Sequence, residues 1–317
     1  MSIVVAGARG QLGGELCRQL GDDAVGLDID DLDLTDGPAV LATLQRLRLA
    51  AVINCAAYTQ VDRAEAEFER CRAVNATAVE HLARACGELD CPLVQISTDY
   101  VFGGAGDSTG TVPVPADTMR SMVAKTGLSP SAGDARPLGF REDDPPAPQG
   151  VYATTKFEGE RAAARHPKHL IVRTCGLYAR PSDARAGNFV KTMLRLGGGG
   201  QPLRVVADQH CTPSYVPHVA RAVLFLLRCE TRPWGIYHVT NRGQTTWCEF
   251  AAEIFRLAGM DVRVQPITTA EYAAAAPRPA YSVLDTSAYH RLGGPPMPDW
   301  QAALAEYFAE WESLRTM

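Results

Sequence analysis

The stretch that decides the fold is VVAGARGQLG, residues 4–13. The apolar run at 2–7 predicts a strand that ends in glycine, and the leucines that follow recur with helical spacing. Between strand and helix, Gly7, Gly10 and Gly13 form a GxxGxxG pattern, which permits a tight turn and a close approach of the backbone to a bound group. The N-terminus of the helix then faces an anion. The sequence therefore predicts a turn that binds the pyrophosphate of a dinucleotide.

Strand and helix patterns alternate outward from this turn through the first hundred residues. The predicted strands are 2–7, 24–29, 50–57 and 92–98, and the predicted helices are 11–21, 37–47 and 69–89. Fully apolar strands that alternate with helices are typical of a parallel sheet covered on both faces. The expected fold class is therefore α/β, a Rossmann-type doubly wound parallel sheet.

The second half of the chain is less regular. Residues 103–137 are an insertion rich in Gly, Ser and Pro, with one short helix predicted at 117–125. The insertion is interpreted as a lid over the substrate, and the alternative is a surface elaboration or an oligomer contact. A helix at 152–164 and a strand at 170–178 then restore the pattern.

Two parts are expected from this order. The dinucleotide-binding Rossmann domain covers 1–180, and 235–266 returns to it. Residues 181–234 and 267–317 build a smaller, mixed C-terminal substrate-binding lobe.

The composition excludes several classes of protein. The 317 residues have a formal net charge of −5 without a Lys/Arg run, which argues against a nucleic-acid binder. No apolar run approaches the ~18 residues of a membrane span, and the first residues do not resemble a signal peptide. The nine cysteines and seven histidines show no metal-ligand spacing. We therefore expect a cytoplasmic protein with reduced thiols, no membrane partner and no metal site.

Two residues give opposite indications about the cofactor. Asp28 ends the second predicted strand, where an acid binds the ribose 2′-hydroxyl of NAD and repels a 2′-phosphate. Arg9, inside the glycine turn, can instead pair with the 2′-phosphate of NADP. Asp28 can also be a solvated residue of the acidic loop DIDDLDLTD (28–36). We expect NADPH or NADH as cofactor.

Polar residues at the end of the fourth strand meet a tyrosine–lysine pair. Thr98, Asp99 and Tyr100 end that strand at the carboxyl edge, where open α/β sheets bind ligands, although Thr and Asp there can also be a helix cap. Tyr152 and Lys156 lie one turn apart on a predicted helix, a spacing that chance would give about 0.13 times in this composition. Tyr152 can donate a proton to a substrate oxygen, and the Lys156 ammonium is expected to lower the pKa of the phenol.

Taken together, the motifs resemble the extended short-chain dehydrogenase/reductases and, within them, the dTDP-4-dehydrorhamnose reductases. The resemblance runs over nearly the whole chain. The motifs are GARGQLGGEL (7–16), DLTD (33–36), VINCAAYTQVDRAE (52–65), VN (74–75), ISTDYVF (96–102), REDDPPAPQGVYATTKFEGE (141–160), NFVKTMLRL (188–196), ADQHCTPSY (207–215) and RPAYSVLDTS (278–287).

The resemblance implies the site position by position. The cofactor would be held by Gly7, Arg9, Gly10, Gln11, Leu12, Gly13, Asp28, Asp33, Leu34, Ala56, Ala57 and Tyr58. Thr98, Tyr152 and Lys156 would be catalytic, and the sugar would lie against Asp99, Tyr100, Gly176 and Asn188. Glu15 matches a position that helps to bind Mg²⁺ between subunits in some relatives, so Mg²⁺ and a homodimer are considered as well.

Three departures from the family pattern concern the substrate. Cys55 stands where the family usually has alanine. In RTCGLYA (173–179) Gly176 replaces a tryptophan that would contact the sugar, which leaves the sugar open. The link before the Tyr152 helix is roughly thirty residues longer than in the family, an unusual length for a loop in a compact domain.

The resemblance implies NAD(P)H-dependent reduction of the 4-keto group of a nucleotide-activated deoxysugar. A nucleotide-sugar epimerase or dehydratase of the same superfamily is the first alternative, but the acid–base pair of the dehydratases is missing, because Tyr100 and not glutamate follows Thr98-Asp99. The second is a regulatory subunit like the β subunit of methionine adenosyltransferase, which would bind a dinucleotide and a partner without turnover.

Overall fold

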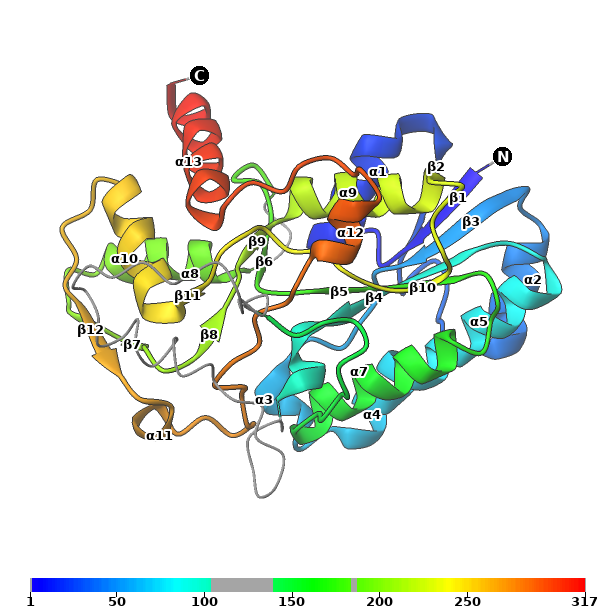
Figure 1. Ribbon diagram of the computed structural model, residues 1–317, viewed down its shortest axis with the longest axis horizontal. Coiled ribbons are helices and arrows are strands. Elements are labelled where there is room, and N and C mark those ends of the chain that lie inside the picture. Colours follow the sequence, from blue (N-terminus) through cyan, green and yellow to red (C-terminus); the bar gives the residue numbers. More distant parts are fainter. Residues whose placement is uncertain (1, 104–138, 184–186, 317) are drawn as a thin grey trace, which may run out of the picture.

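A six-stranded, all-parallel sheet forms the centre of the molecule (Figure 1). The computed structural model describes residues 2–103, 139–183 and 187–316. Along the sheet the strand order is β10-β5-β4-β3-β1-β2. These strands are β1 (Ser2–Ala6), β2 (Ala24–Leu27), β3 (Leu49–Asn54), β4 (Leu93–Thr98), β5 (His169–Thr174) and β10 (Gly235–His238). The order reverses between β1 and β3, and ligands of such sheets bind outside the carboxyl ends of the strands at this point.

Helices cover both faces of the sheet, so the predicted doubly wound α/β fold is confirmed (Figure 1). One apolar cluster joins the sheet to α1 (Gln11–Leu20) and α9 (Val216–Arg228). A second cluster joins the other face to α2 (Gly37–Gln45), α5 (Ala78–Glu88) and α7 (Gly150–Ala163). The short helices α3 (Val61–Ala64) and α4 (Phe68–Arg72), the π-helical turn Ala73–Thr77 and α12 (Ser287–Arg291) complete the two layers.

A smaller lobe with its own apolar core lies beside the carboxyl ends of the strands (Figure 1). Phe250, Trp300 and Tyr307 are among the buried side chains of this core. Its helices are α8 (Phe189–Gly197), α10 (Trp247–Leu257), α11 (Thr269–Tyr272) and α13 (Trp300–Thr316). Three two-stranded sheets pair β6 (Leu177–Tyr178) with β9 (Ser214–Tyr215), β8 (His210–Cys211) with β11 (Thr245–Thr246), and β7 (Leu203–Val206) with β12 (Val264–Ile267).

The division that we propose from this packing differs from the sequence expectation at two helices. The range 181–234 was expected in the lobe, but α9 packs on the sheet, because its buried valines and leucines share a cluster with α1. The range 235–266 was expected to return to the sheet. Its strand β10 does so beside β5, whereas α10 packs in the core of the lobe.

The lid helix expected at 117–125 lies outside the described residues, as does the insertion 103–137 apart from Gly103. None of the described helices is long and apolar enough to cross a membrane.

Candidate active site

The glycine turn joins β1 to α1 as predicted. Gly7 has a φ of 75°, and a Cβ added to it would lie 2.6 Å from the Ala56 backbone nitrogen. A Cβ on Gly13 would lie 2.2 Å from the Gly7 carbonyl oxygen. Only glycine permits this approach of the turn, α1 and the end of β3. Gly10 caps α1, whereas the Leu12 side chain is buried in the core, so the main chain of this segment is what a pyrophosphate could meet.

Arg9 and the acidic loop after β2 are already paired with each other. The Arg9 guanidinium binds the Asp30 carboxylate, which raises the pKa of Arg9. Asp28 accepts hydrogen bonds from the backbone nitrogens of Arg9 at 2.8 Å and Ile29 at 2.9 Å. Arg9 and Asp28 therefore both lie at the glycine turn. The carboxylate that pairs with the Arg9 guanidinium is that of Asp30, whereas Asp28 binds the Arg9 backbone nitrogen.

Asn188, which was expected to contact the sugar, is hydrogen-bonded to the first residue of α1. Its amide nitrogen donates to Gln11 Oε1 at 3.1 Å, and its Oδ1 caps α8 by accepting from the Lys191 backbone nitrogen at 3.0 Å. Gln11 Oε1 also accepts from the Ala179 backbone nitrogen at 2.9 Å. Gln11 Oε1 therefore joins the first turn of α1 to residue 179 and, through Asn188, to the start of α8.

The other expected cofactor residues line the same edge. Ala56 and Ala57 follow β3, and Tyr58 is buried, with its hydroxyl donating to Glu67 at 2.9 Å. Hydrogen bonds from Thr35 lower the pKa of Asp33, and the neighbouring Leu34 is half-buried. Asn75, in the π-helical turn, accepts from the Tyr58 backbone nitrogen at 2.9 Å and so fixes this segment.

Thr98, Tyr152 and Lys156 meet at the carboxyl end of β4. Thr98 is the last residue of that strand, and its side chain is near enough to the Tyr152 hydroxyl to lower the pKa of that phenol. The Lys156 ammonium is buried one turn further along α7 and donates to the Ile96 carbonyl of β4 at 2.6 Å. A phenol, a hydroxyl and an ammonium group are therefore held together at the edge where a ligand of the sheet would bind.

The pKa values at this site differ from the sequence expectation. Burial raises the pKa of Tyr152, opposed by the nearby Thr98 side chain, whereas the nearby Lys156 was expected to lower it. Burial lowers the pKa of Lys156 to about 8, and Glu160 opposes that change. Because low polarity disfavours both charged forms, Tyr152 stays a protonated phenol at neutral pH. A protonated phenol is the form that can donate a proton to a substrate.

Asp99 and Tyr100 were both expected to face the sugar, but Asp99 faces inward. It is 2% exposed, and its carboxylate accepts from Thr98 at 3.1 Å and from Ser282 at 2.5 Å. The short 3-10 helix Asp99–Phe102, which Thr98 caps, turns this side chain away from the sheet edge. The half-buried ring of Tyr100 instead lies edge-on to Tyr152, with 5.8 Å between the ring centroids.

Gly176 adds no side chain to the site. Its φ is 53°, and an added Cβ would lie 3.1 Å from Pro213 Cα and 3.2 Å from the Trp247 ring. The half-buried Trp247 indole therefore already stands beside residue 176. The Gly176 carbonyl accepts a hydrogen bond from the Ser214 backbone nitrogen at 3.2 Å.

A buried ion pair beneath the site was not predicted from the sequence. Arg173 on β5 donates to both carboxylate oxygens of Glu160 at 2.9 and 2.8 Å, and Ser97 on β4 donates to Glu160 at 2.6 Å. Both members of the pair are almost inaccessible. The available signal was a glutamate four residues after Lys156, which places the two side chains on one face of α7.

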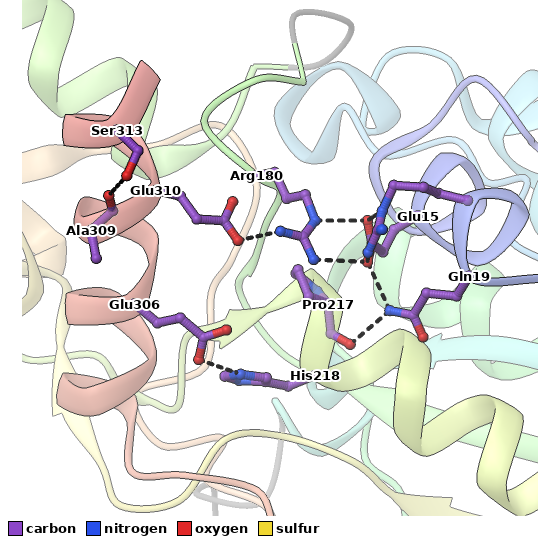
Figure 2. A network of polar contacts seen from close by, with 10 residues as sticks. Glu15, Gln19, Arg180, Pro217, His218, Glu306, Ala309, Glu310 and Ser313 are labelled. Carbon is purple, nitrogen blue, oxygen red and sulfur yellow. Dashed lines mark hydrogen bonds and ion pairs between the residues drawn. The ribbon is translucent and has the colours of Figure 1, made fainter. Parts of the chain in front are cut away.

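Glu15, considered for Mg²⁺, is engaged by basic side chains instead (Figure 2). Its carboxylate accepts from Arg18 at 2.8 and 2.5 Å, from Gln19 at 2.7 Å and from Arg180 at 3.1 Å. The described residues contain no cluster of three His, Cys, Asp or Glu side chains that could hold a metal ion. The structure therefore gives the Mg²⁺ expectation no support.

Comparison with known proteins agrees with this geometry over nearly the whole chain. A dTDP-4-dehydrorhamnose reductase of Streptomyces griseus is 40% identical over 314 residues, which cover 96% of this chain and 92% of that protein. The corresponding protein of Mycobacterium tuberculosis is 36% identical over 97% and 92% of the two chains. A crystal structure of a dTDP-4-dehydrorhamnose reductase from Bacillus anthracis in complex with NADP is 36% identical, covers 98% of this chain and 100% of that one, and superimposes with a TM-score of 0.83.

The family pattern described as the RmlD substrate binding domain matches residues 1–313. Together with these full-length relatives, the match shows that this chain belongs to the RmlD family, the extended short-chain dehydrogenase/reductases that resemble dTDP-4-dehydrorhamnose reductase.

Proposed function

We propose that this protein is an NAD(P)H-dependent reductase of the 4-keto group of a nucleotide-activated deoxysugar, as in dTDP-4-dehydrorhamnose reductase. The main supporting observation is the buried Tyr152 phenol, beside Thr98 and one turn from the Lys156 ammonium, at the same carboxyl edge of the sheet as the glycine turn. Relatives of 36–40% identity over nearly the full length have the same reductase name.

The glycine turn has the shape that a nicotinamide dinucleotide requires. A side chain at Gly7 would collide with the Ala56 backbone, and one at Gly13 would collide with the backbone of Gly7 and Ala8 in the turn itself. We assign the main chain of residues 10–12 to the pyrophosphate, and Arg9 and Asp28 to the adenosine ribose. The bound dinucleotide would supply the hydride for the reduction.

Side chains at the end of β4 and on α7 would supply the proton and stabilise the phenolate that remains after its transfer. Tyr152 is the general acid that donates its proton to the 4-keto oxygen, because burial keeps its phenol protonated. The Lys156 ammonium stabilises the phenolate that remains. Thr98 lies beside the Tyr152 hydroxyl and opposes the rise of its pKa, and Tyr100, edge-on to Tyr152, borders the sugar.

An absorbance assay tests this function. Purified protein with NADPH and a panel of dTDP-4-keto sugars should lose absorbance at the wavelength of the reduced nicotinamide. A protein that binds the dinucleotide but reduces none of the sugars would instead behave as the non-catalytic regulatory subunit. The cytoplasmic location and the homodimer stay predictions.

The reduction should lose rate above pH 8. The Lys156 pKa is lowered to about 8, and only its charged form, present below that pH, stabilises a phenolate. We expect kcat/KM to fall about tenfold per pH unit above pH 8. A pH profile from 6 to 10 checks this, with Lys168→Met, a change of a partly exposed lysine, as a control that keeps the profile. A rate that stays constant to pH 10 would contradict the role of the ammonium.

The protein should use NADH and NADPH with similar values of kcat/KM. Asp28 and Arg9 oppose each other, so we expect kcat/KM values for NADH and NADPH within about tenfold, or ~1.4 kcal/mol. Asp28→Ala should shift the ratio toward NADPH, as the sequence indicates. Asp30→Ala should do so too, by up to about tenfold, because it releases the Arg9 guanidinium for a 2′-phosphate.

Asp22→Ala, at another exposed acid near β2, is the matched control and should leave the ratio unchanged. A wild-type preference above about a thousandfold in either direction, or ~4 kcal/mol, would show that one of these residues has been misinterpreted.

A further inference from the structure

Arg180 joins three parts of the molecule that are far apart in the sequence (Figure 2). Its guanidinium donates to both carboxylate oxygens of Glu15 on α1, from Nε at 3.1 Å and from Nη2 at 3.4 Å. The remaining nitrogen, Nη1, binds the Glu310 carboxylate on α13. The Arg180 side chain is 25% exposed and that of Glu15 is 5% exposed, so water and salt screen their attraction less than that of a surface pair.

Residues 179 and 180 hold α1 at two places. The Ala179 backbone nitrogen donates to Gln11 Oε1 at 2.9 Å, and the next side chain, that of Arg180, binds Glu15. Gln11 and Glu15 are four residues apart in α1, so they lie on one face of the helix, one turn from each other. Two contacts placed in this way resist both sliding of the helix along its axis and rotation about that axis. They form a clamp on α1.

The part of α1 that the clamp holds is the part that would meet the cofactor. The helix begins at Gln11, directly after Gly10 of the glycine turn. The other side of the clamp is the segment that leaves β5, because β6 lies between β5 and Arg180. β5 ends at Thr174, in register with Thr98 at the end of β4. The clamp therefore sets the place of the glycine turn relative to the carboxyl ends of β4 and β5.

The local partners of Glu15 do not make this connection. Arg18 donates to the same carboxylate at 2.8 and 2.5 Å, but it belongs to α1 itself. Gln19, also on α1, donates to Glu15 at 2.7 Å and to the Pro217 carbonyl at the start of α9 at 3.1 Å. Within the part of the chain that the structure describes, Arg180 is the hydrogen-bond partner of this carboxylate that comes from outside α1.

We propose that Arg180 is a positioning residue for the dinucleotide. Through Glu15 it holds the first turns of α1, and with them the glycine turn, at a fixed place relative to the strand ends where the reduction occurs. This inference rests on the proposed function, because it concerns the cofactor of that reaction. A site that is already ordered loses less free energy to ordering when its ligand binds. Loss of the clamp should therefore appear first as a loss of cofactor affinity.

Two variants that each remove one cation from Glu15 separate positioning from charge. Arg180→Met should raise the dissociation constant of NADPH, measured by fluorescence titration, by about tenfold. Arg18→Met removes a cation from the same carboxylate, but Arg18 lies on α1 and its side chain is 55% exposed. This matched control should stay within about twofold of the wild type. Equal losses in the two variants, or no loss in Arg180→Met, would overturn the proposal.

Two further measurements distinguish positioning from a general loss of structure. Glu15→Met should weaken NADPH binding by itself, and the addition of Arg180→Met should then change the dissociation constant by less than about twofold, because the contact is already lost. At saturating NADPH, the KM of Arg180→Met for the keto sugar should stay within about twofold of the wild type. Additive losses in the double variant, or a KM that rises as much as the dissociation constant, would contradict the role of Arg180.

The titration needs no sugar, so it separates this inference from the proposed function. If the wild type binds NADPH but reduces no sugar, the proposed function fails and the variants still test the clamp. If the wild type binds neither NADPH nor NADH, both fail. If Arg180→Met does not fold, Glu310→Leu takes its place, because it removes the second partner that orients the Arg180 guanidinium. It should raise the dissociation constant about threefold, and an unchanged value would overturn the proposal.

Discussion

Replacement of Tyr152 by phenylalanine is expected to lower kcat for the keto sugar by about 10²–10⁴-fold. The change removes only the phenolic hydroxyl and leaves the ring packed edge-on to Tyr100. The dissociation constant of NADPH should be almost unchanged, because the glycine turn does not contain this residue. Steady-state rates, together with a fluorescence titration of NADPH, measure both quantities.

Tyr237→Phe is a suitable control for this experiment. Its hydroxyl donates to the Pro233 carbonyl at 2.8 Å, on the edge strand β10. Loss of that bond should cost about 1 kcal/mol of stability and leave kcat unchanged. If Tyr152→Phe reduces the keto sugar at nearly the wild-type rate, Tyr152 is not the proton donor.

Arg173→Met should lower the free energy of unfolding by about 3–5 kcal/mol, because it leaves the buried Glu160 carboxylate without its cation. The guanidinium also lies 5.0 Å from the centroid of the Phe102 ring, so its removal also loses packing at the end of β4. The double change Arg173→Met and Glu160→Met should recover part of the loss, since no isolated charge remains. Urea denaturation of the wild type and of these two variants measures these differences.

The chain offers a matched pair at the surface. Arg72 donates to Glu158 at 2.8 Å, also onto α7, but both side chains are partly exposed. Arg72→Met should cost at most about 1 kcal/mol, because water screens the pair. Equal losses for Arg72→Met and Arg173→Met would mean that burial does not decide the strength of the Arg173–Glu160 pair.

Local patterns in the sequence were sufficient for the sheet. The strand that ends at Gly7, the helix after it and the alternation that follows each depend on residues close together in the chain, and β10 returns to the sheet as predicted. The packing of α9 and α10 could not be predicted in the same way. Both helices have a wide apolar face, and periodicity alone does not say which core that face enters.

Side-chain direction limited the prediction of the site. Thr98, Tyr152 and Lys156 were brought together as expected, because the end of a strand and one face of a helix fix their places. The side chains of Asp99 and Asn188 are instead hydrogen-bonded to Ser282 and Gln11, respectively. These partners lie 183 and 177 residues away along the chain, so local patterns did not indicate them. No motif at the end of β4 indicates such a distant donor.

The link from Glu15 through Arg180 to Glu310 (Figure 2) has a consequence for synthesis on the ribosome. Arg180 is added 165 residues after Glu15, and Glu310 a further 130 residues later. At translation rates of about 5–20 residues per second, roughly 15–60 s pass between the first and the last member. Until Arg180 has been added, α1 has only its local partners Arg18 and Gln19 for the carboxylate of Glu15, and Arg180 in turn has no Glu310 until the end of that time. The helical layer that contains α1 is therefore expected to reach its final order late, when α13 has left the exit tunnel and docks.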